Sequence, residues 1–220
     1  MMIRINLIRH GKTVGNLKNR YIGTTDEPLC PEGIRELPVG AYAGSQAWFI
    51  SPLRRCLETA ALLCRAENLQ CTEESMEDVV RTFLREENRE IVTDFRECDF
   101  GIFENKNYRE LAGCLEYQQW IDSGAALPFP KGEAPDAFRK RCCRAFEYAV
   151  DRICTENWQE VCMVVHGGTI MSIMERYAAP GRAYFDWEVK NAGGYRLMLD
   201  PKIWRERRQL GGYEALHMGN

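Results

Sequence analysis

Three short apolar runs in this chain each end at a polar turn and precede a segment with helical periodicity. Runs of this length that are rich in β-branched and aromatic residues are typical of strands buried in a sheet. The runs and their turns are residues 2–8 with Arg9-His10-Gly11, residues 47–50 with Ser51-Pro52, and residues 161–165 with His166-Gly167-Gly168.

The segments around the second and third runs predict amphipathic helices. Ser51 is a favourable N-cap and Pro52 suits the first helical position, so we expect a helix to begin there with Arg54 in its first turn. The first exposed N–H groups of such a helix favour an anion. Residues 169–177 predict a helix after the third run. The helical faces are Leu53, Cys56, Leu57, Ala60, Ala61 and Cys64 after the second run, and Phe138, Cys142, Phe146, Ala149, Val150 and Ile153 before the third.

Strands that alternate with helices predict a three-layer α/β/α sandwich around a mostly parallel central sheet. No linker-like segment divides the chain, so we expect residues 1–220 to form one domain. Ligands of such folds bind beyond the carboxyl ends of the strands. Arg9, His10, Arg54 and His166 all follow strand ends, so we expect these four side chains to converge.

The middle and the end of the chain carry weaker patterns. Residues 75–88 are charged and predict a helix, and we expect part of residues 75–135 to form a flap or insertion over the site. Residues 91–95 are interpreted as a strand leading to Glu97, and residues 193–199 as a last strand at a sheet edge. The charged tail from Lys202 predicts no element, and His217 within it is expected to be exposed and inert.

Charge and cysteine usage exclude several classes of protein. The net charge is −3 and no basic stripe is present, so we expect neither a nucleic-acid partner nor a membrane-surface partner. No apolar run approaches the roughly 20 residues of a membrane span, and no signal peptide is recognisable. The 10 cysteines lack CxxC spacing and lie mostly in amphipathic runs, which predicts reduced thiols in a cytoplasmic protein. The sequence predicts no oligomeric state.

The polar turns carry the residue types of phosphoryl transfer. A neutral imidazole can attack phosphorus, while guanidinium groups and a second imidazole hold the phosphoryl oxygens. A carboxylic acid can protonate the leaving oxygen. The candidates for these roles are the imidazoles of His10 and His166, the guanidinium groups of Arg9 and Arg54, and the carboxyl group of Glu97. These roles predict a phosphomonoester hydrolase that works through a phosphohistidine.

The same pieces resemble the histidine phosphatase superfamily, in the branch that contains cofactor-dependent phosphoglycerate mutases and alpha-ribazole phosphatases. Any one motif is weak, but the full set in the right order is specific. The matching stretches are Arg-His-Gly-x-Thr-x-x-Asn at residues 9–16, Gly-x-x-Asp-x-Pro-Leu at 23–29, Ser-Pro-Leu-x-Arg-x-x-x-Thr-Ala at 51–60, Glu-x-x-x-Gly at 97–101, a Gly-Glu-x-x-x-x-Phe-x-x-Arg stretch assigned to Gly132–Arg139, and His-Gly at 166–167.

The resemblance implies a role for each matching residue. His10 would be phosphorylated, Glu97 would donate and accept the proton, and no metal or organic cofactor would take part. The substrate would be a small phosphorylated metabolite. The implied phosphate and substrate ligands are Arg9, Thr13, Asn16, Gly23, Arg54, His166 and Gly167. Weaker candidates for the same region are Lys12, Arg20, Tyr21, Glu133 and Arg139.

Several alternatives stay open at the level of sequence. Asp99 and Glu104 compete with Glu97 for the role of the acid, and Arg55 is expected to be a solvated helix residue. Departures from the family pattern around Phe103 and Ala134 leave the identity of the ester undecided. The same residues would serve a phosphoglycerate mutase, and a non-catalytic domain that binds phosphorylated ligands is a third hypothesis.

Overall fold

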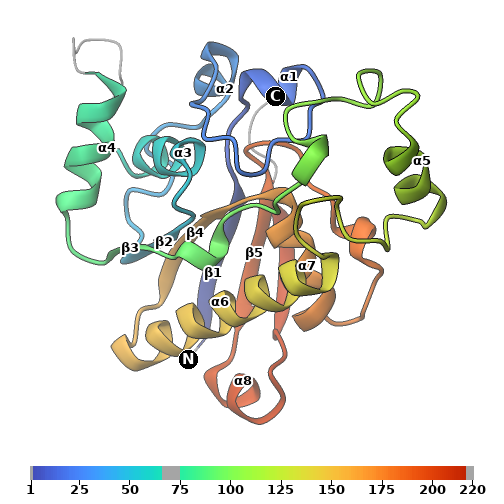
Figure 1. Cartoon of the computed structure of the whole chain (residues 1–220). Coiled ribbons are helices and arrows are strands. Elements are labelled where there is room, and N and C mark those ends of the chain that lie inside the picture. The colour runs from blue at the N-terminus through green and yellow to red at the C-terminus, as the bar shows by residue number, and fades with distance from the viewer. Residues whose placement is uncertain (1, 66–74, 217–220) are drawn as a thin grey trace.

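A mixed sheet forms the centre of the molecule. The computed structural model describes residues 2–65 and 75–216, and its six strands lie in the order β3-β2-β4-β1-β5-β6 (Figure 1). Strands β1 to β4 are parallel, and β5 runs antiparallel to both of its neighbours. The strands are β1 (Ile3–Arg9), β2 (Ala47–Ile50), β3 (Arg89–Ile91), β4 (Glu160–Val165), β5 (Gly194–Leu199) and β6 (Gly212–Leu216).

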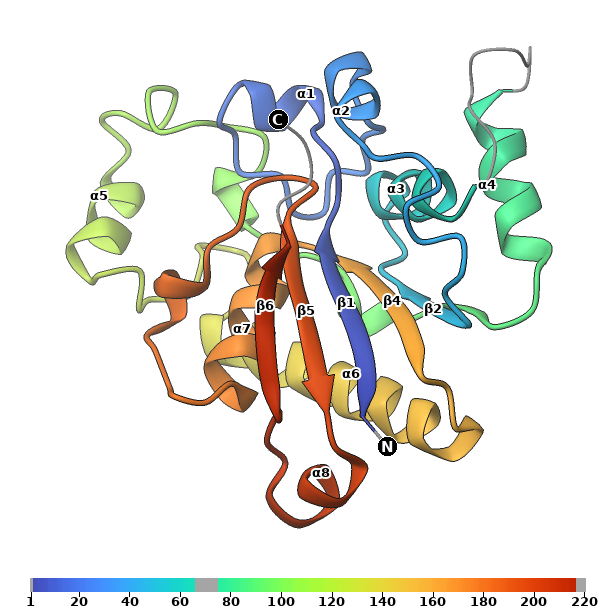
Figure 2. The same ribbon diagram turned by 180° about the vertical axis from the view of Figure 1, so that it is seen from behind.

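Helices cover both faces of the sheet, as the alternating pattern predicts. Figures 1 and 2 show α6 and α7 on one face and α3 and α4 beside the other. Side chains alternate between the two cores: Leu7 and Met163 pack toward α6 and α7, and Ile8 and Val164 pack toward α3. The helices are α1 (Val14–Leu17), α2 (Pro31–Arg35), α3 (Arg54–Cys64), α4 (Met76–Arg85), α5 (Leu115–Asp122), α6 (Pro135–Glu156), α7 (Gly167–Tyr177) and α8 (Pro201–Arg207), with short 3₁₀ turns η2 (Thr93–Phe95), η3 (Gly101–Phe103) and η4 (Tyr184–Trp187).

The three apolar runs are strands β1, β2 and β4, and their pairing brings the polar turns together. In the parallel register Arg9 lies opposite Val165, and Ile50 lies opposite Val164. The backbone N–H of His10 donates to the carbonyl of Val165 at 3.0 Å, and the N–H of Ser51 donates to the carbonyl of Val164 at 3.0 Å. The turns that carry the candidate residues therefore meet at one edge of the sheet.

Two predicted elements begin at other residues. Helix α3 begins at Arg54 with Leu53 as its N-cap, so the prediction of Ser51 as the N-cap is wrong. The hydroxyl of Ser51 lies against His166 instead. The strand expected at residues 91–95 is β3 at Arg89–Ile91, because the 3₁₀ turn η2 takes up the residues that follow.

The C-terminal part of the described chain also differs from the prediction. Strand β5 lies between β1 and β6, so it is not an edge strand. The charged tail forms helix α8 and the edge strand β6, held by Trp204, which is buried in the core next to Phe146 and Tyr177. One large aromatic side chain is sufficient to dock a helix that is otherwise polar. His217 lies outside the described residues.

The expected flap separates into two parts. Helix α4 is the helix predicted at 75–88, and Val79 and Phe83 bury it against α3 and Trp48. The part from Cys98 through α5 instead forms its own cluster of apolar side chains, centred on Phe103 and Phe129. Only this second part lies beside the cavity described below. That it acts as a flap stays a prediction.

Within the described residues, no helix is both long enough and apolar enough to cross a membrane. The nine cysteines in the same part of the chain are free thiols, five of them buried. Burial raises the pKa of the Cys56 and Cys162 thiols to about 12, so both are protonated and poor nucleophiles.

Gly33 in α2 packs directly against the loop that follows His10, and this contact generates a stability prediction. A Cβ at Gly33 would lie 2.2 Å from the carbonyl oxygen of Lys12. We expect Gly33→Ala to lower the free energy of unfolding by about 1–3 kcal/mol, because the backbone of the loop must shift. Chemical denaturation measures this difference. Gly44→Ala is the control, since no atom lies within 4 Å of its Cβ position; equal effects of the two variants would contradict the prediction.

Candidate active site

His10 lies buried at the end of β1 with its ring orientation fixed by the next residue. Its Nδ1 is 2.7 Å from the carbonyl oxygen of Gly11, and the side chain is 4 % exposed. A carbonyl only accepts, so Nδ1 carries the proton and Nε2 keeps its lone pair. The N–H of Gly11 is in turn held by the hydroxyl of Thr59 at 3.0 Å. The loop therefore presents Nε2 as a nucleophile in a defined tautomer.

The surroundings of His10 favour its neutral form. Burial, followed by the charges of Arg55 and Arg9, holds the pKa of His10 well below its usual range. A cationic imidazolium would lose hydration there and face two guanidinium groups. His10 is therefore uncharged at neutral pH, as an attacking imidazole must be.

His166 is the second imidazole of the site. Its ring centroid lies 5.2 Å from that of His10, and the Oγ of Ser51 lies 2.7 Å from its Nε2. Burial and the charge of Arg55 also hold the pKa of His166 well below the usual range. His166 is fully buried as the N-cap of α7, so a neutral imidazole and the helix N-terminus face the same space.

Arg9 reaches the site from the last position of β1. One of its Nη atoms donates to the carbonyl of Val189 at 2.7 Å, while its buried Nε has no partner within the described residues. The guanidinium carbon lies 3.5 Å from the Cβ position of Gly167, which places this group against the first turn of α7 at ordinary contact distance. One Nη atom therefore fixes the guanidinium group of Arg9, and its Nε–H is available to donate to a ligand.

In the stretch that starts at Ser51, the arginine that reaches the site is Arg55 and not Arg54. The side chain of Arg54 is 44 % exposed and pairs with Glu58 at 2.6 Å, which directs it away from the histidines. Arg55 is 0 % exposed, so the prediction of a solvated residue is wrong. The spacing Ser-Pro-Leu-x-Arg, counted from Ser51, already ends at Arg55. One helical residue is a rotation of about 100°, which separates a solvent-facing from a site-facing side chain.

Arg55 connects the site to the loop before α2. It donates to the carbonyls of Ile22, Gly23 and Thr25 at 2.8–3.2 Å, and its buried Nε has no partner in the described part of the chain. Arg9 and Arg55 therefore both keep a buried N–H donor near His10. Gly23 is needed for close packing, because a Cβ there would lie 1.9 Å from the carbonyl oxygen of Cys98.

Glu97 lies beside the first turn of α7. Its Oε1 accepts from the N–H of Cys98 at 2.9 Å and lies 3.0 Å from the Cβ position of Gly168. Burial raises the pKa of Glu97 above the usual carboxyl range, against the opposing charges of Arg55, Arg9 and Arg141. The structure thus favours a protonated carboxyl that can donate.

Arg141 holds the segment that carries Glu97, and this residue was missed by the sequence analysis. It forms two hydrogen bonds to Glu133 at 2.7 and 2.8 Å and donates to the backbone carbonyls of Asp94, Arg96 and Glu97. The motif that starts at Gly132 places an arginine three residues after Phe138, which is Arg141. Glu133 is therefore an ion-pair partner rather than a substrate contact.

The two competing acids are engaged elsewhere. Glu104 accepts from the N–H groups of Gly23 and Thr25 at 2.8 and 2.9 Å. Asp99 accepts from the N–H of Gly101 at 2.8 Å. Both carboxylates tie loops together as acceptors, so Glu97 is the carboxyl group in position to donate a proton.

Asn16 and Thr13 support the loop that holds His10. They form the capping box of α1, and the Nδ2 of Asn191 donates to the Oδ1 of Asn16 at 3.1 Å and to the carbonyl of His10 at 3.2 Å. Asn16 also lines an open groove with Arg9 and Lys12. Thr13 is 0 % exposed, which leaves it a role in the loop rather than at the surface of the groove.

The weaker candidates separate into two regions. Lys12 pairs with Glu36 at 2.7 Å, and Arg20 pairs with Glu110 at 2.5 Å, both in the open groove. Tyr21 and Arg139 line the cavity that contains Glu97. Among residues 2–65 and 75–216, no three His, Cys, Asp or Glu side chains are grouped as metal ligands.

The sequence matches a known family over most of the chain. A family model for the histidine phosphatase superfamily (branch 1) matches residues 5–209. The chain belongs to the histidine phosphatase superfamily. It is therefore an enzyme of the class that acts on phosphomonoesters.

Relatives of this histidine phosphatase include mutases and phosphatases. A 2,3-bisphosphoglycerate-dependent phosphoglycerate mutase of Rhizobium etli is 30 % identical, covering 96 % of this chain and 99 % of the relative. A broad-specificity phosphatase of Saccharomyces cerevisiae is 26 % identical over 79 % of this chain and 70 % of its own. A solved alpha-ribazole-5'-P phosphatase of Escherichia coli, described as putative, shares the fold with a TM-score of 0.70, 20 % identity, and coverage of 99 % of this chain and 96 % of that one.

The two neighbouring arginines of this histidine phosphatase form a matched pair for mutagenesis. We expect Arg55→Lys to lower kcat for phosphate ester hydrolysis by about 10²–10³-fold, because a lysine cannot reproduce the planar donor set near the phosphoryl oxygens. Arg54→Lys should retain activity within about twofold, since its side chain is exposed. Steady-state kinetics on both variants, with circular dichroism as a folding check, measures the difference. A larger loss in Arg54→Lys would restore the original assignment.

The opposed pKa shifts of His10 and Glu97 predict a pH profile for this histidine phosphatase. Activity falls with decreasing pH as His10 is protonated, and the shift places this limb below about pH 6.5. Activity falls with increasing pH as Glu97 loses its proton, and its raised pKa places that limb above the usual carboxyl value.

The profile is measured as kcat/KM from about pH 4 to pH 9, corrected for ionisation of the substrate. Glu97→Gln is the control, because it removes the alkaline limb and leaves the acid limb in place. An acid limb centred at or above the usual histidine pKa would contradict the prediction.

Proposed function

We propose that this enzyme is a metal-independent phosphatase that hydrolyses a small phosphomonoester in two steps through phospho-His10. The observation that carries the proposal is that one site holds His10, oriented by the Gly11 carbonyl and kept neutral by burial, and the buried Glu97, whose pKa burial raises, with the charges of Arg9 and Arg55 acting on both. A domain that only binds phosphate has no need of a buried acid opposite an imidazole lone pair.

In the first step, the lone pair of His10 Nε2 attacks phosphorus and the bond to the ester oxygen breaks. Glu97 gives its proton to the leaving oxygen, so the alcohol departs uncharged. The ring gains positive charge as the N–P bond forms, and the Gly11 carbonyl at Nδ1 stabilises it. Arg9, Arg55 and neutral His166 are the proposed donors to the phosphoryl oxygens.

In the second step, the Glu97 carboxylate takes a proton from water while the water oxygen attacks phosphorus. The N–P bond breaks, inorganic phosphate leaves, and Nε2 regains its lone pair. Glu97 is again protonated, so the cycle closes without another acid or base. A metal ion is not required in this scheme, because the arginines supply the positive charge.

A phosphoglycerate mutase is the second candidate, because the name of the Rhizobium etli relative gives that activity. A mutase would return the phosphoryl group from His10 to a phosphoglycerate instead of to water. It would then interconvert phosphoglycerates when primed with bisphosphoglycerate and release little inorganic phosphate.

The first test is hydrolysis of p-nitrophenyl phosphate and ethyl phosphate in EDTA. We expect activity in the wild type, a loss of at least about 10³-fold in His10→Ala, and a loss of about 10²–10⁴-fold in Glu97→Gln on ethyl phosphate. Glu97→Gln should lose less on p-nitrophenyl phosphate, because nitrophenolate leaves without a proton. Phosphate release measures the activity of each of the three proteins on both esters.

The controls separate this proposal from its competitors. Glu104→Gln is the matched control for the acid, since Glu104 caps a loop rather than lining the cavity. Full activity in His10→Ala, or activity that EDTA abolishes, would overturn the phosphatase mechanism. Isotope exchange between phosphoglycerates without phosphate release would assign the mutase.

A further inference from the structure

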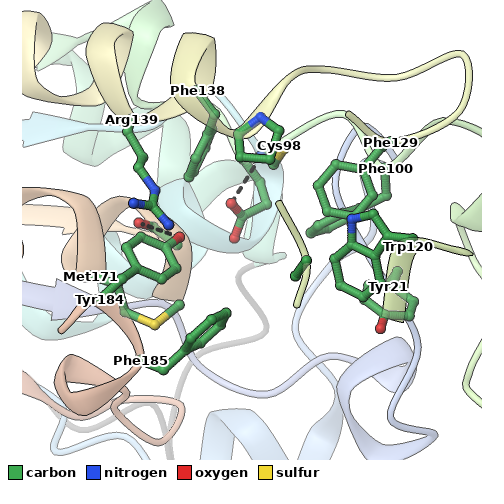
Figure 3. Close-up of a pocket in the computed structure, with 14 residues that line it drawn as sticks. Tyr21, Cys98, Phe100, Trp120, Phe129, Phe138, Arg139, Met171, Tyr184 and Phe185 are labelled. Carbon is green, nitrogen blue, oxygen red and sulfur yellow. Dashed lines mark hydrogen bonds between the residues drawn. The ribbon is translucent and has the colours of Figure 1, made fainter. Parts of the chain in front are cut away.

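Glu97 forms part of the wall of a cavity that the phosphate-binding residues do not line. The cavity has a volume of about 230 Å³ and lies beside the first turn of α7 (Figure 3). An acid must lie within hydrogen-bond reach of the oxygen that it protonates. The alcohol part of the ester is bonded to that oxygen, so the position of Glu97 directs the alcohol into this cavity.

The lining of the cavity is predominantly aromatic. Figure 3 shows Tyr21, Phe100, Trp120 and Phe129 on one side, and Tyr184 and Phe185 on the other. Trp120 and Phe129 lie 5.1 Å apart between ring centroids, and Phe100 and Phe129 lie 5.0 Å apart, edge to face. These contacts fix the rings as one rigid wall, and flat rings in contact favour another flat ring.

The charges of the cavity are already compensated. Arg139 is the one Lys or Arg among the described lining residues. It pairs with Glu175 at 3.1 Å, and its guanidinium carbon lies 4.1 Å from the ring centre of Tyr184. An alcohol that carries a carboxylate would lose hydration against aromatic walls and would compete with Glu175 for this arginine.

The volume of the cavity limits the size of the alcohol group that it can hold. An apolar cavity of about 150 Å³ takes one benzene ring, so a cavity of this size accommodates a larger, one- or two-ring group. Its mouth is marked by Phe185, whose side chain is 62 % exposed. An exposed ring at the entrance gives the ligand a further apolar surface to contact.

We propose, on the basis of the proposed phosphatase function, that the substrate is a phosphomonoester of an uncharged alcohol bearing a flat aromatic group, which binds between Trp120 and Tyr184. The phosphate is held by the arginines and histidines, and the aromatic group is held by the cavity. Selection among phosphomonoesters then depends on apolar burial and not on charge recognition at the alcohol.

Two esters with similar leaving groups test the inference. Naphthylethyl phosphate and ethyl phosphate both release a primary alcohol, so a difference in kcat/KM reports binding of the ring rather than leaving-group chemistry. We expect the naphthylethyl ester to be preferred at least about tenfold. Equal kcat/KM values, both dependent on His10, would overturn the inference and leave the phosphatase function standing. A preference for phosphoglycerate over the naphthylethyl ester would overturn it as well.

Two variants locate the effect in the cavity. Trp120→Ala should lower kcat/KM for the naphthylethyl ester by about tenfold and leave that for ethyl phosphate within about twofold. Tyr108→Ala is the matched control, because Tyr108 is a 57 % exposed aromatic residue of the same segment that does not line the cavity. An equal loss on both esters in Trp120→Ala would indicate structural damage rather than ring recognition, and would overturn the assignment of Trp120.

A binding measurement separates failure of the inference from failure of the proposed function. If no ester is hydrolysed, the phosphatase proposal fails, and calorimetric titration of naphthylethanol into the wild-type protein still tests the cavity. Saturable binding that Trp120→Ala weakens and Tyr108→Ala preserves supports the aromatic site. Absence of binding at the solubility limit of naphthylethanol overturns it.

Discussion

The buried guanidinium group of Arg55 is the charge on which the chemistry of this site depends. After burial itself, it is the largest electrostatic influence that lowers the pKa values of His10 and His166. It also opposes the rise in the pKa of Glu97. The same side chain binds three backbone carbonyls of the loop that includes Gly23. Removing the charge would therefore change both the protonation of the catalytic groups and the packing around them.

Burial also shifts the pKa values of the two proposed catalytic groups in opposite directions, against the order in which they titrate in water. In water, glutamic acid ionises before histidine becomes neutral, so the combination of neutral imidazole and protonated carboxyl is present in only about 0.5 % of molecules at the best pH. The structure lowers the pKa of His10 and raises that of Glu97, which makes this combination more populated. Two groups that are pushed in opposite directions in one site are expected of an acid and a nucleophile.

Much of the fold and part of the site could be predicted from the sequence. Strands β1, β2 and β4 are recognisable because they are buried on both faces and end at glycine or proline turns. Strand β6 and helix α8 were missed because their polar residues carry no period and both depend on distant contacts: β6 pairs with β5, and Trp204 of α8 is buried next to Phe146 and Tyr177. Composition does not separate Arg54 from Arg55, but the spacing Ser-Pro-Leu-x-Arg counted from Ser51 indicates Arg55, and the helix rotation buries that side chain. The hydroxyl of Ser51 binds His166 across the sheet, a tertiary contact that overrides its local preference for capping.

Arg141 fixes the position of Glu97 by contacts that are distinct from those within the cavity wall. The backbone at Glu97 and the side chain of Glu133 are both bound to α6 by this one guanidinium group, while the chain between them is held separately, through Glu104 and Glu110, to the segment around Arg20 and Gly23. Much of the cavity wall, including Trp120 and Phe129, lies in the chain between Glu97 and Glu133. The proposed proton donor is therefore held by Arg141, whereas Trp120 and Phe129 hold each other. Replacing a ring of the cavity wall would then change the alcohol that fits the cavity without releasing the contact that positions Glu97.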